Sequence, residues 1–496
     1  MDGAISASTG ARPVSESAQV SAAGGRDRRW LALVLIAVAQ LMVALDATIV
    51  SIALPSAQSA LGVPDADRQW VITAYTLAFG GLLLLGGRIA DYMGRKRTFL
   101  IGLAGFAAAS ALGGAAANFG VLVGARALQG AFAALLAPTA LSLLAVTFTE
   151  PRERATAFAV YGAVAGSGAA VGLLLGGILT QYVNWRWCLY VNVPVAAGAA
   201  LGGWRVLMTS EATRRQRFDI PGVILATGGL VALVYACSQA VLEGWSSRTV
   251  TALLATSALL LGSFAVRETR APSPLLPLGI VLDRNRGGAY VSVMLAIAGM
   301  FGAFLFLTYY LQVVLRYSPV EAGLAFLPMA AASQLGSWGI ASRLMPYLPP
   351  RALIAPGALV AASGMTVLTQ LQVNGGYVIH VLPAEILLGI GIACVMVPAF
   401  STGTLGVDVR QAGAAAAIVN TASQVGGSLG TALLNTIAAG TTAGYLASQP
   451  LSMGAHALAL VHGYAVATAW AAGILALGAV LALLLINAGR PARRQA

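Results

Sequence analysis

Charged side chains are scarce in this chain. Only 9% of its 496 residues are Asp, Glu, Lys or Arg, whereas a soluble domain carries about 25%. So few charges cannot cover a surface that faces water, and the composition therefore excludes an ordinary soluble protein. The net charge is +12, and Lys96 is the only lysine. A basic balance can indicate nucleic-acid binding. In a chain this apolar it favours the cytoplasmic loops of a membrane protein, and no nucleic-acid partner is expected.

Cysteine and histidine are equally rare, with three of each. Cys188, Cys237 and Cys394 are scattered through apolar stretches, which excludes a disulfide framework and a zinc site. The histidines, at positions 380, 456 and 462, form no metal-ligand cluster. The chain also lacks the G-x-x-x-x-G-K-[ST] phosphate loop. We therefore expect no metal, no ATP and no other cofactor.

What the chain has in excess is apolar residues, which make up 58% of it. They fall in runs of about 20, the length that crosses ~30 Å of hydrocarbon as a helix. The sequence predicts an all-α membrane protein with fourteen transmembrane helices. The predicted ranges are 30–54, 69–90, 97–117, 119–147, 155–181, 188–207, 220–242, 249–267, 287–315, 321–345, 351–371, 378–400, 411–439 and 460–487.

Charged linkers divide these helices into groups. The stretches 211–220 and 267–286 flank the seventh and eighth helices. They predict two six-helix bundles with an extra helix pair between them. The expected units are a disordered tail (1–29), an N-terminal bundle (30–208), linkers with two extra helices (209–286), a C-terminal bundle (287–489) and a basic tail (490–496). The first apolar run, from Trp30, is too long for a signal peptide and is expected to stay as a helix.

Arginines orient the helices. One set of loops, together with both tails, holds most of them, and the opposite loops hold only Arg68, Arg186, Arg248 and Arg316. Because positive loops stay in the cytoplasm, both termini are predicted to be cytoplasmic. An even number of membrane-spanning helices places both termini on the same side, and the predicted fourteen is even.

The strongest motif is GGRIADYMGRKR, at 86–97, in a cytoplasmic loop. Gly87 would let its helix approach a neighbour closely, Asp91 would accept from a helix N-terminus or pair with an arginine, and Gly94 would permit the turn. Arg95, Lys96 and Arg97 would hold the loop inside. A generic positive loop explains the basic residues but not the spacing of the glycines and Asp91. The pattern resembles the loop signature of the major facilitator superfamily.

Asp46 lies in the first helix, within LDATIVSIALP (45–55). A carboxylate in hydrocarbon costs several kcal/mol, so it should face a cavity, pair with a cation or carry a proton. The stretch resembles the first-helix signature of fourteen-helix drug:proton antiporters within that superfamily. Asp46 is therefore a candidate to load and release a proton. The alternative is a structural carboxylate satisfied by hydroxyl groups.

Two further ionisable residues lie inside predicted helices. Arg126, in RALQG, resembles the fourth-helix arginine motif of the superfamily, which implies a part in proton coupling. By depth, Asp46 is its best partner, and a static salt bridge is the open alternative. Glu385, in LPAEILLGIG, is a candidate for a second protonation or cation-recognition site, or else an interface residue that reaches water.

Other polar residues could line a substrate cavity. Tyr309, Tyr310 and Gln312 offer aromatic faces and an amide to a flat or cationic compound, although interface packing explains them equally well. Asn420 and Gln424, one turn apart on a later helix, are weaker candidates of the same kind.

The stretch GSGAAVGLLLGG (166–177) looks at first like a nucleotide loop. Such a loop needs a preceding strand and an acid about 20 residues later, and neither is present. Gly168, Gly172, Gly176 and Gly177 instead form a helix-packing face. They resemble the fifth-helix antiporter motif G-x-x-x-G-P-x-x-G-G, but Leu173 occupies the proline position. An uninterrupted, straighter helix is therefore expected here.

The resemblance covers about residues 30–487 and implies two bundles that rock around a midplane site. It implies a proton-coupled exporter of a small amphipathic drug, embedded in the lipid bilayer of a bacterial plasma membrane. Transport of another metabolite, such as an amino acid or siderophore, or import, is the first alternative, which Leu173 favours. A membrane sensor or enzyme is the second, but the short loops offer no catalytic cluster. The oligomeric state is left open, with a monomer as the simplest case.

Overall fold

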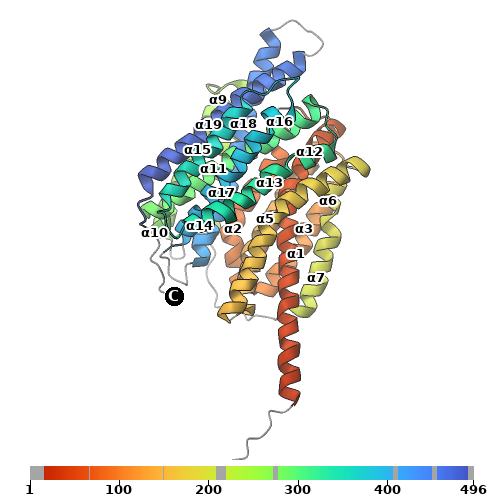
Figure 1. Cartoon of the computed structure of the whole chain (residues 1–496), viewed down its shortest axis with the longest axis vertical. Helices are drawn as coiled ribbons and strands as arrows, with labels where there is room; N and C mark the ends of the chain where they lie inside the picture. Colours follow the sequence, from red (N-terminus) through yellow and green to blue (C-terminus); the bar gives the residue numbers. More distant parts are fainter. Residues whose placement is uncertain are drawn as a thin grey trace, which may run out of the picture.

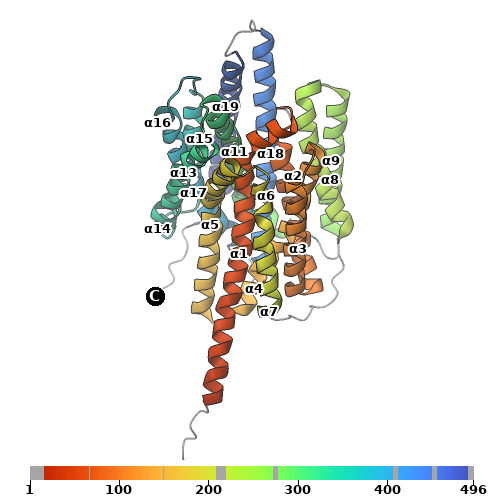
Figure 2. The same ribbon diagram turned by 90° about the vertical axis from the view of Figure 1, so that its right-hand side faces the viewer.

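The computed structural model describes residues 16–65, 67–148, 150–207, 219–271, 278–405, 412–448 and 455–489. Helices fill these segments, and no strand occurs within them. They lie side by side as an elongated bundle (Figures 1 and 2). The end that carries Gly94 is the predicted cytoplasmic end and is called the inner end below. The opposite end, which carries Arg68, is called the outer end.

The helices before the first linker are α1 (Glu16–Leu61), α2 (Trp70–Met93), α3 (Arg95–Gly114), α4 (Phe119–Thr147), α5 (Pro151–Tyr182), α6 (Trp187–Tyr190) and α7 (Asn192–Val206). The extra pair is α8 (Ile220–Glu243) and α9 (Arg248–Arg270), followed by the short α10 (Leu278–Val281). The remaining elements are α11 (Arg284–Tyr309), η1 (Tyr310–Val314), α12 (Pro319–Ala325), α13 (Leu327–Gln334), η2 (Leu335–Ala341), α14 (Ser342–Leu344), α15 (Arg351–Leu368), α16 (Tyr377–His380), α17 (Leu382–Thr404), α18 (Ala412–Ser448) and α19 (Ala455–Leu485).

Each predicted range contains helix, but the boundaries and continuity differ. α1 begins at Glu16, before the predicted start at Trp30, because an apolar run marks where lipid begins rather than where helical hydrogen bonds begin. The predicted helix 321–345 is broken at Phe326, two residues before Pro328, and continues as α13 and then as the π-helical η2. A proline removes one backbone donor and crowds the preceding turn, which accounts for the break.

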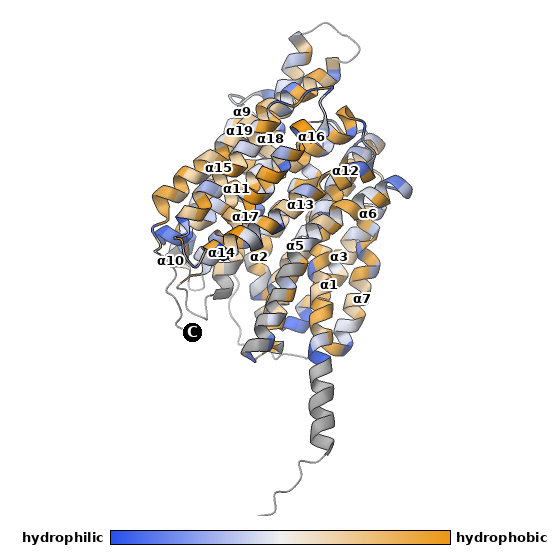
Figure 3. Cartoon of the chain, viewed as in Figure 1, coloured by the Kyte–Doolittle hydropathy of each residue, from blue (hydrophilic) through white to orange (hydrophobic). Residues whose placement is uncertain are grey.

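Among the described residues, nine helices are long and apolar enough to cross a membrane by length and composition. Their apolar residues occupy the middle of the molecule, and hydrophilic residues gather near the ends (Figure 3). This pattern is that of a multi-pass membrane protein. The count of fourteen and the sidedness of the termini stay predictions.

Packing groups the helices on either side of the linkers. α1 packs on α5 and α7, and α4 packs on α2 and α3. After the linkers, α15 packs on α17 and α19, and α11 packs on α17, α18 and α19. The helices before residue 208 are called the first half below, and those after residue 278 the second half. α8 and α9 pack on each other and lie at one edge (Figure 2), where α8 packs on α2 and α18.

Two large apolar cores lie within this arrangement. One is confined to the first half, towards its inner end, around Phe99, Phe106 and Phe148. The other joins the outer part of the first half to the second half, from Ile49 to Tyr464. The halves are therefore packed together at the outer end, and their helices diverge towards the inner end in Figure 1.

Candidate functional site

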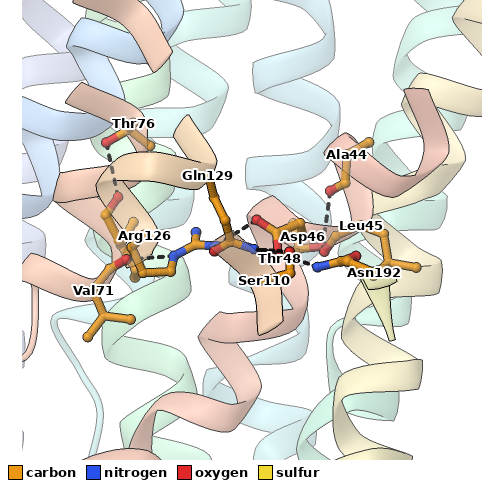
Figure 4. Close-up of polar contacts among 11 residues, drawn as sticks. Ala44, Leu45, Asp46, Thr48, Val71, Thr76, Ser110, Arg126, Gln129 and Asn192 are labelled. Carbon is orange, nitrogen blue, oxygen red and sulfur yellow. Dashed lines mark hydrogen bonds and ion pairs between the residues drawn. The ribbon is translucent and has the colours of Figure 1, made fainter. Parts of the chain in front are cut away.

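Asp46 lies in the middle of α1 and is 0% exposed. Its Oδ2 accepts a hydrogen bond from Nη1 of Arg126 at 2.6 Å. Its Oδ1 accepts from Nε2 of Gln129 at 3.0 Å and from Nδ2 of Asn192 at 2.7 Å. Both carboxylate oxygens are thus engaged, and Figure 4 shows the three donors converging on them from α4 and α7.

Arg126 is equally enclosed, at 1% exposed. Its Nε donates to the carbonyl of Val71 at 3.0 Å, and its guanidinium lies 4.3 Å from the centre of the Tyr75 ring. Nη1 also donates to Oε1 of Gln129 at 2.9 Å, and Gln129 continues the chain of bonds to Ser110 of α3 at 2.7 Å. The pair predicted from depth is therefore present and lies inside a polar network that spans α1, α2, α3, α4 and α7.

Gln129 and Asn192 were not predicted as members of this network. Gln129 lies three residues after Arg126, on the same face of α4, which is a signal the sequence did contain. Asn192 begins α7 directly after the break from α6 at Val191, and no local pattern marks it. A buried ion pair is stabilising only when its remaining hydrogen-bonding groups also have partners. The side-chain amides of Gln129 and Asn192 are those partners.

Glu385 lies in the first turn of α17 and is also 0% exposed. It therefore does not reach water, which removes the alternative of an interface residue. Its Oε2 is 3.0 Å from the hydroxyl of Tyr377. Its Oε1 has no hydrogen-bond partner among the described residues. Asp46 and Glu385 are thus both buried carboxyls, but among the residues that the structure describes only Asp46 has a cationic partner.

A cavity of about 130 Å³ lies between the halves. Apolar side chains from both halves line it, with a few hydroxyls and one amide, and no charged residue is among its described lining residues. The lining comes from Ala47, Thr48, Ser51, Ile72, Leu173, Met300, Phe301, Phe304, Phe326, Met329, Ala330, Ser333, Gln334, Leu388, Gly389 and Ile392. Ala47 and Thr48 follow Asp46 directly, and Leu388 and Gly389 lie one turn after Glu385. Neither carboxyl lines the cavity, but each lies within about one helical turn of residues that do.

The residues predicted for a substrate cavity lie elsewhere. Tyr309 and Gln312 bond to the first half at the outer end, Tyr309 to the side chain of Gln58 and Gln312 to the carbonyl of Ile52 at 3.0 Å. Tyr310 is buried, and its hydroxyl donates to the carbonyl of Gln372 at 2.7 Å. None of them lines the cavity described above.

Asn420 and Gln424 are half-buried on α18. Gln424 faces Gly80 of α2, where an added Cβ would lie 2.7 Å from the Gln424 Cβ. α2 and α18 therefore approach each other closely at this point, one helix from each half. Neither residue lines the cavity.

The loop at 86–97 joins α2 to α3 at the inner end. Gly94 adopts φ +88°, a conformation that glycine adopts readily, so the turn depends on it. Lys96 Nζ donates to the carbonyls of Trp204 and Leu207 at 2.7 Å each, at the C-terminus of α7. Arg95 is half-buried, Arg97 is exposed, and the side chain of Asp91 lies outside the described residues.

The close approach assigned to Gly87 is made by its neighbour. A Cβ added at Gly87 would meet Pro138 at an ordinary 3.7 Å, whereas one added at Gly86 would lie 2.0 Å from the carbonyl oxygen of Ala134. Gly86 therefore lets α2 pack against α4. The sequence alone could not choose between adjacent glycines, because they differ only in which helix face they occupy.

The glycines of α5 pack against two partners. Cβ atoms added at Gly168, Gly172 and Gly176 would lie 2.6 Å from Ala44, 2.2 Å from Thr48 and 2.8 Å from Ile49, all on α1. A Cβ at Gly177 would lie 2.6 Å from the carbonyl oxygen of Pro319, in the second half. α5 is one uninterrupted helix, and Leu173 lies in the cavity wall.

A Gly172→Ala variant is expected to unfold at a lower temperature and to lose transport. The added Cβ would lie 2.2 Å from Thr48 Oγ1 and 2.8 Å from the Leu45 carbonyl oxygen, and overpacking of this kind costs about 1–3 kcal/mol or more. Thermal unfolding in detergent measures the change. Gly198→Ala is the matched control, because nothing lies within 4 Å of its added Cβ. Equal behaviour of the two variants would show that α1 and α5 do not need this contact.

Arg68 was predicted to be a loop residue but is 2% exposed. Its Nε donates to Oδ1 of Asn435 at 3.1 Å, and Nη1 lies 3.5 Å from Oδ1 of Asp65. Its guanidinium lies 3.8 Å from the centre of the Tyr309 ring. Asn435 in turn donates to the side chain of Gln69. Arg68 therefore links the first half to α11 and α18 of the second, and we call this group the outer cluster.

Comparisons with known proteins agree with this picture. The sequence pattern of the Major Facilitator Superfamily matches residues 36–431. The puromycin resistance protein pur8 of Streptomyces alboniger is 56% identical over 467 residues, which is 94% of this chain and 92% of that protein. The cephamycin export protein CmcT of Amycolatopsis lactamdurans is 39% identical over 86% of this chain and 87% of its own length.

Solved structures match the fold at low identity. A bacterial homologue of the human lysosomal transporter Spinster, crystallised in an inward-facing and unoccupied conformation, aligns with a TM-score of 0.66 at 16% identity, over 92% of this chain and 97% of its own. The peptide transporter PepTSo aligns with a TM-score of 0.68 at 14% identity, over the same 92% of this chain and 97% of its own. At these identities, both matches support the arrangement of the helices and nothing more.

Proposed function

Because this chain belongs to the major facilitator superfamily, a family of membrane transporters rather than enzymes, we propose that it is a proton-coupled antiporter that exports an amphipathic, cationic antibiotic across a bacterial plasma membrane. The observation that carries the proposal is the buried Asp46–Arg126 pair beside an apolar cavity that both halves line. The proposed architecture is fourteen transmembrane helices with both termini in the cytoplasm.

Puromycin is the first compound to test, because a relative 56% identical is a puromycin resistance protein. Puromycin carries an amine that takes up a proton near neutral pH, together with two aromatic systems. Phe301, Phe304 and Phe326 in the cavity wall offer aromatic faces to such groups. Ser333 and Gln334 supply hydrogen-bonding groups for orientation.

The cavity must widen during the cycle. Its volume of about 130 Å³ is below the ~300–1,000 Å³ usual for drug-sized ligands. The two halves are packed together at the outer end, so widening would come from separation of the halves around a site near the midplane. In the proposed cycle the outer end closes while the inner end admits substrate, and the reverse state releases it.

Proton re-entry would supply the energy. One charge that moves down a potential of 100 mV releases about 2.3 kcal/mol, enough for about fifty-fold accumulation at tenfold per 1.4 kcal/mol. Asp46 would take a proton from the outside and release it to the cytoplasm, with Arg126 controlling how tightly it is held. Glu385 is proposed as a second proton or cation site.

An Asp46→Asn variant is expected to lose puromycin-driven proton movement. Asparagine fits the same space but cannot exchange a proton, so substrate and proton would no longer be linked. A pH-sensitive dye inside proteoliposomes measures the proton flux after puromycin is added. Asp67→Asn, in the outer loop, is the control. Full coupling in Asp46→Asn would remove Asp46 from the proposed cycle.

Import, or transport of another metabolite, is the second candidate, and Leu173 is the residue that favours it. Leu173 occupies the position where antiporters of the resembled family carry a kinking proline, and it lines the cavity. Inside-out vesicles separate the two directions. Accumulation of puromycin inside them on energisation supports export, and depletion supports import.

A further inference from the structure

Glu385 differs from Asp46, the other buried carboxyl close to the cavity, in having an unused oxygen. Asp46 has both oxygens hydrogen-bonded and a cation at 2.6 Å. Glu385 has one contact, to Tyr377, and an unpartnered Oε1 within the part of the chain that the structure describes. An ionised carboxylate that is buried without a cation is costly. The surroundings of Glu385 therefore suit its protonated form.

The hydroxyl of Tyr377 gives independent support. It lies 2.7 Å from the carbonyl oxygen of Ala325 and 3.0 Å from Oε2 of Glu385. A phenol has one proton to donate, and a carbonyl can only accept. With Glu385 ionised, Tyr377 has to share its single proton between the two acceptors. With Glu385 protonated, Tyr377 can donate to Ala325 while Glu385 donates to Tyr377, and each contact then has its own proton. The geometry therefore suits a neutral Glu385 at the start of a short chain of donors.

Loss of the proton from Glu385 would break this chain. Two acceptors, the carboxylate and the Ala325 carbonyl, would then compete for one phenolic proton. The charged acceptor makes the stronger hydrogen bond, so Tyr377 would turn its proton towards Glu385. The carbonyl of Ala325 would lose its donor.

Ala325 stands at a point where the helix can respond. It is the last residue of α12, and α13 begins at Leu327. Phe326, between them, is 0% exposed, lies 5.3 Å from Phe304 between ring centres and lines the cavity. On the other side, Leu388 and Gly389 of the cavity wall lie about one turn, 5.4 Å, beyond Glu385 along α17. Phe326 at the helix break therefore lines the cavity, and Glu385 lies one turn of α17 away from the cavity wall.

We propose that Tyr377 is a positioning residue that transmits the protonation state of Glu385 to the helix break at Phe326, so that a cation entering the cavity displaces the Glu385 proton and reshapes the cavity wall. This inference rests on the proposed function and assigns the cation-recognition step to Glu385. Asp46 is less suited to that step, because Arg126, Gln129 and Asn192 already occupy its oxygens.

The other groups that face Glu385 are few. At the outer end, the described titratable groups on elements packed on α17 are Tyr377 and His380 of α16, Tyr309 of α11 and Tyr445 of α18. Tyr310, Arg316 and Tyr317 lie in the segment that follows α11. The arginines of the described elements packed on α17 lie at their inner ends, at positions 284, 286, 343 and 351. His380 is half-buried, and its ring Nδ1 lies 3.3 Å from the carbonyl of Gly376, so it is the one group whose titration must be separated from that of Glu385.

The test is infrared difference spectroscopy of the full-length protein in liposomes, first as a pH titration and then on addition of puromycin. The wild type should show a protonated-carboxyl band that Glu385→Gln removes, and puromycin should bleach that band. Tyr377→Phe should keep the band but move its titration midpoint upwards by about one pH unit, tenfold in proton affinity, because the ionised form loses a charge-assisted donor. His380→Gln should leave the midpoint unchanged.

Tyr310→Phe is the matched control. It also loses a hydroxyl bound to a backbone carbonyl at the outer end, at 2.7 Å from the carbonyl of Gln372, but it has no carboxyl partner. It should destabilise the protein as much as Tyr377→Phe does and leave the titration midpoint in place. An unshifted midpoint in Tyr377→Phe, or a band that survives Glu385→Gln, overturns the proposal even if proton-coupled export is intact. The band could instead behave as expected in the pH titration while puromycin drives no proton movement in the wild type. In that case the proposed function fails and the role of Tyr377 stands.

Discussion

An Arg126→Met variant is expected to lose about 3–5 kcal/mol of stability, because it leaves the Asp46 carboxylate buried without its cation. The variant removes the 2.6 Å contact to Asp46, the 3.0 Å bond to the Val71 carbonyl and the stacking on Tyr75. Thermal unfolding in detergent, with expression level as a second measure, reports the loss. Transport should fall to background.

A double variant decides whether the pair is static or switching. Asp46→Asn with Arg126→Gln removes both charges but keeps hydrogen-bonding groups, and neutral replacements of a buried pair are often close to neutral in stability. We expect most of the lost stability to return and transport to stay absent. Recovery of both stability and proton-coupled transport would show that the pair is a static brace between α1 and α4. The double variant therefore answers the question that proximity alone leaves open.

The sequence could predict this pair because an isolated charge in an apolar run must have a partner, and only a few residues at the right depth qualify. The neutral residues that complete the network around the pair, Gln129 and Asn192, were harder to predict. In the sequence, Asn192 looks like any asparagine at the edge of a loop. It can hydrogen-bond to Asp46 only because α7 begins there. In the same way, the sequence placed a close helix contact near Gly87 but could not tell that Gly86 makes it.

Arg68 shows a deeper limit of sequence reasoning. Its neighbours are Pro64, Asp65 and Asp67, a polar and turn-rich stretch that predicts an exposed loop. Its burial depends on Tyr309, Asn435 and Tyr464, which lie hundreds of residues away in the chain. Long-range contacts of this kind follow from how the two halves meet, and no local pattern encodes them. Glu385 was found from its position in an apolar run, but its unpartnered oxygen could be seen only in the structure.

The outer cluster leads to the second large effect. An Arg68→Ala variant is expected to shift the protein towards states open at the outer end. It removes a charge-assisted hydrogen bond to Asn435 and the stacking on Tyr309, which together contribute about 1.5–3 kcal/mol to closure. At tenfold per 1.4 kcal/mol, the open population should rise by roughly ten- to a hundred-fold. Arg68→Lys should restore little of the closure. A lysine ammonium lacks the planar guanidinium group that can hydrogen-bond to Asn435 and stack on Tyr309 at the same time.

Accessibility of the cavity from outside measures this shift. Thr48 lines the cavity, and the three native cysteines are buried, so Thr48→Cys can report labelling by a membrane-impermeant maleimide applied to whole cells. Labelling should be slow in the parent and much faster when Arg68→Ala is added. Arg248→Ala, an exposed arginine at the same end, should leave the rate unchanged. If Arg68→Ala labels no faster than Arg248→Ala, closure of the outer end is carried by the apolar contacts around Ile49 and Tyr310, and Arg68 would then serve to satisfy buried polar groups rather than to hold the halves together.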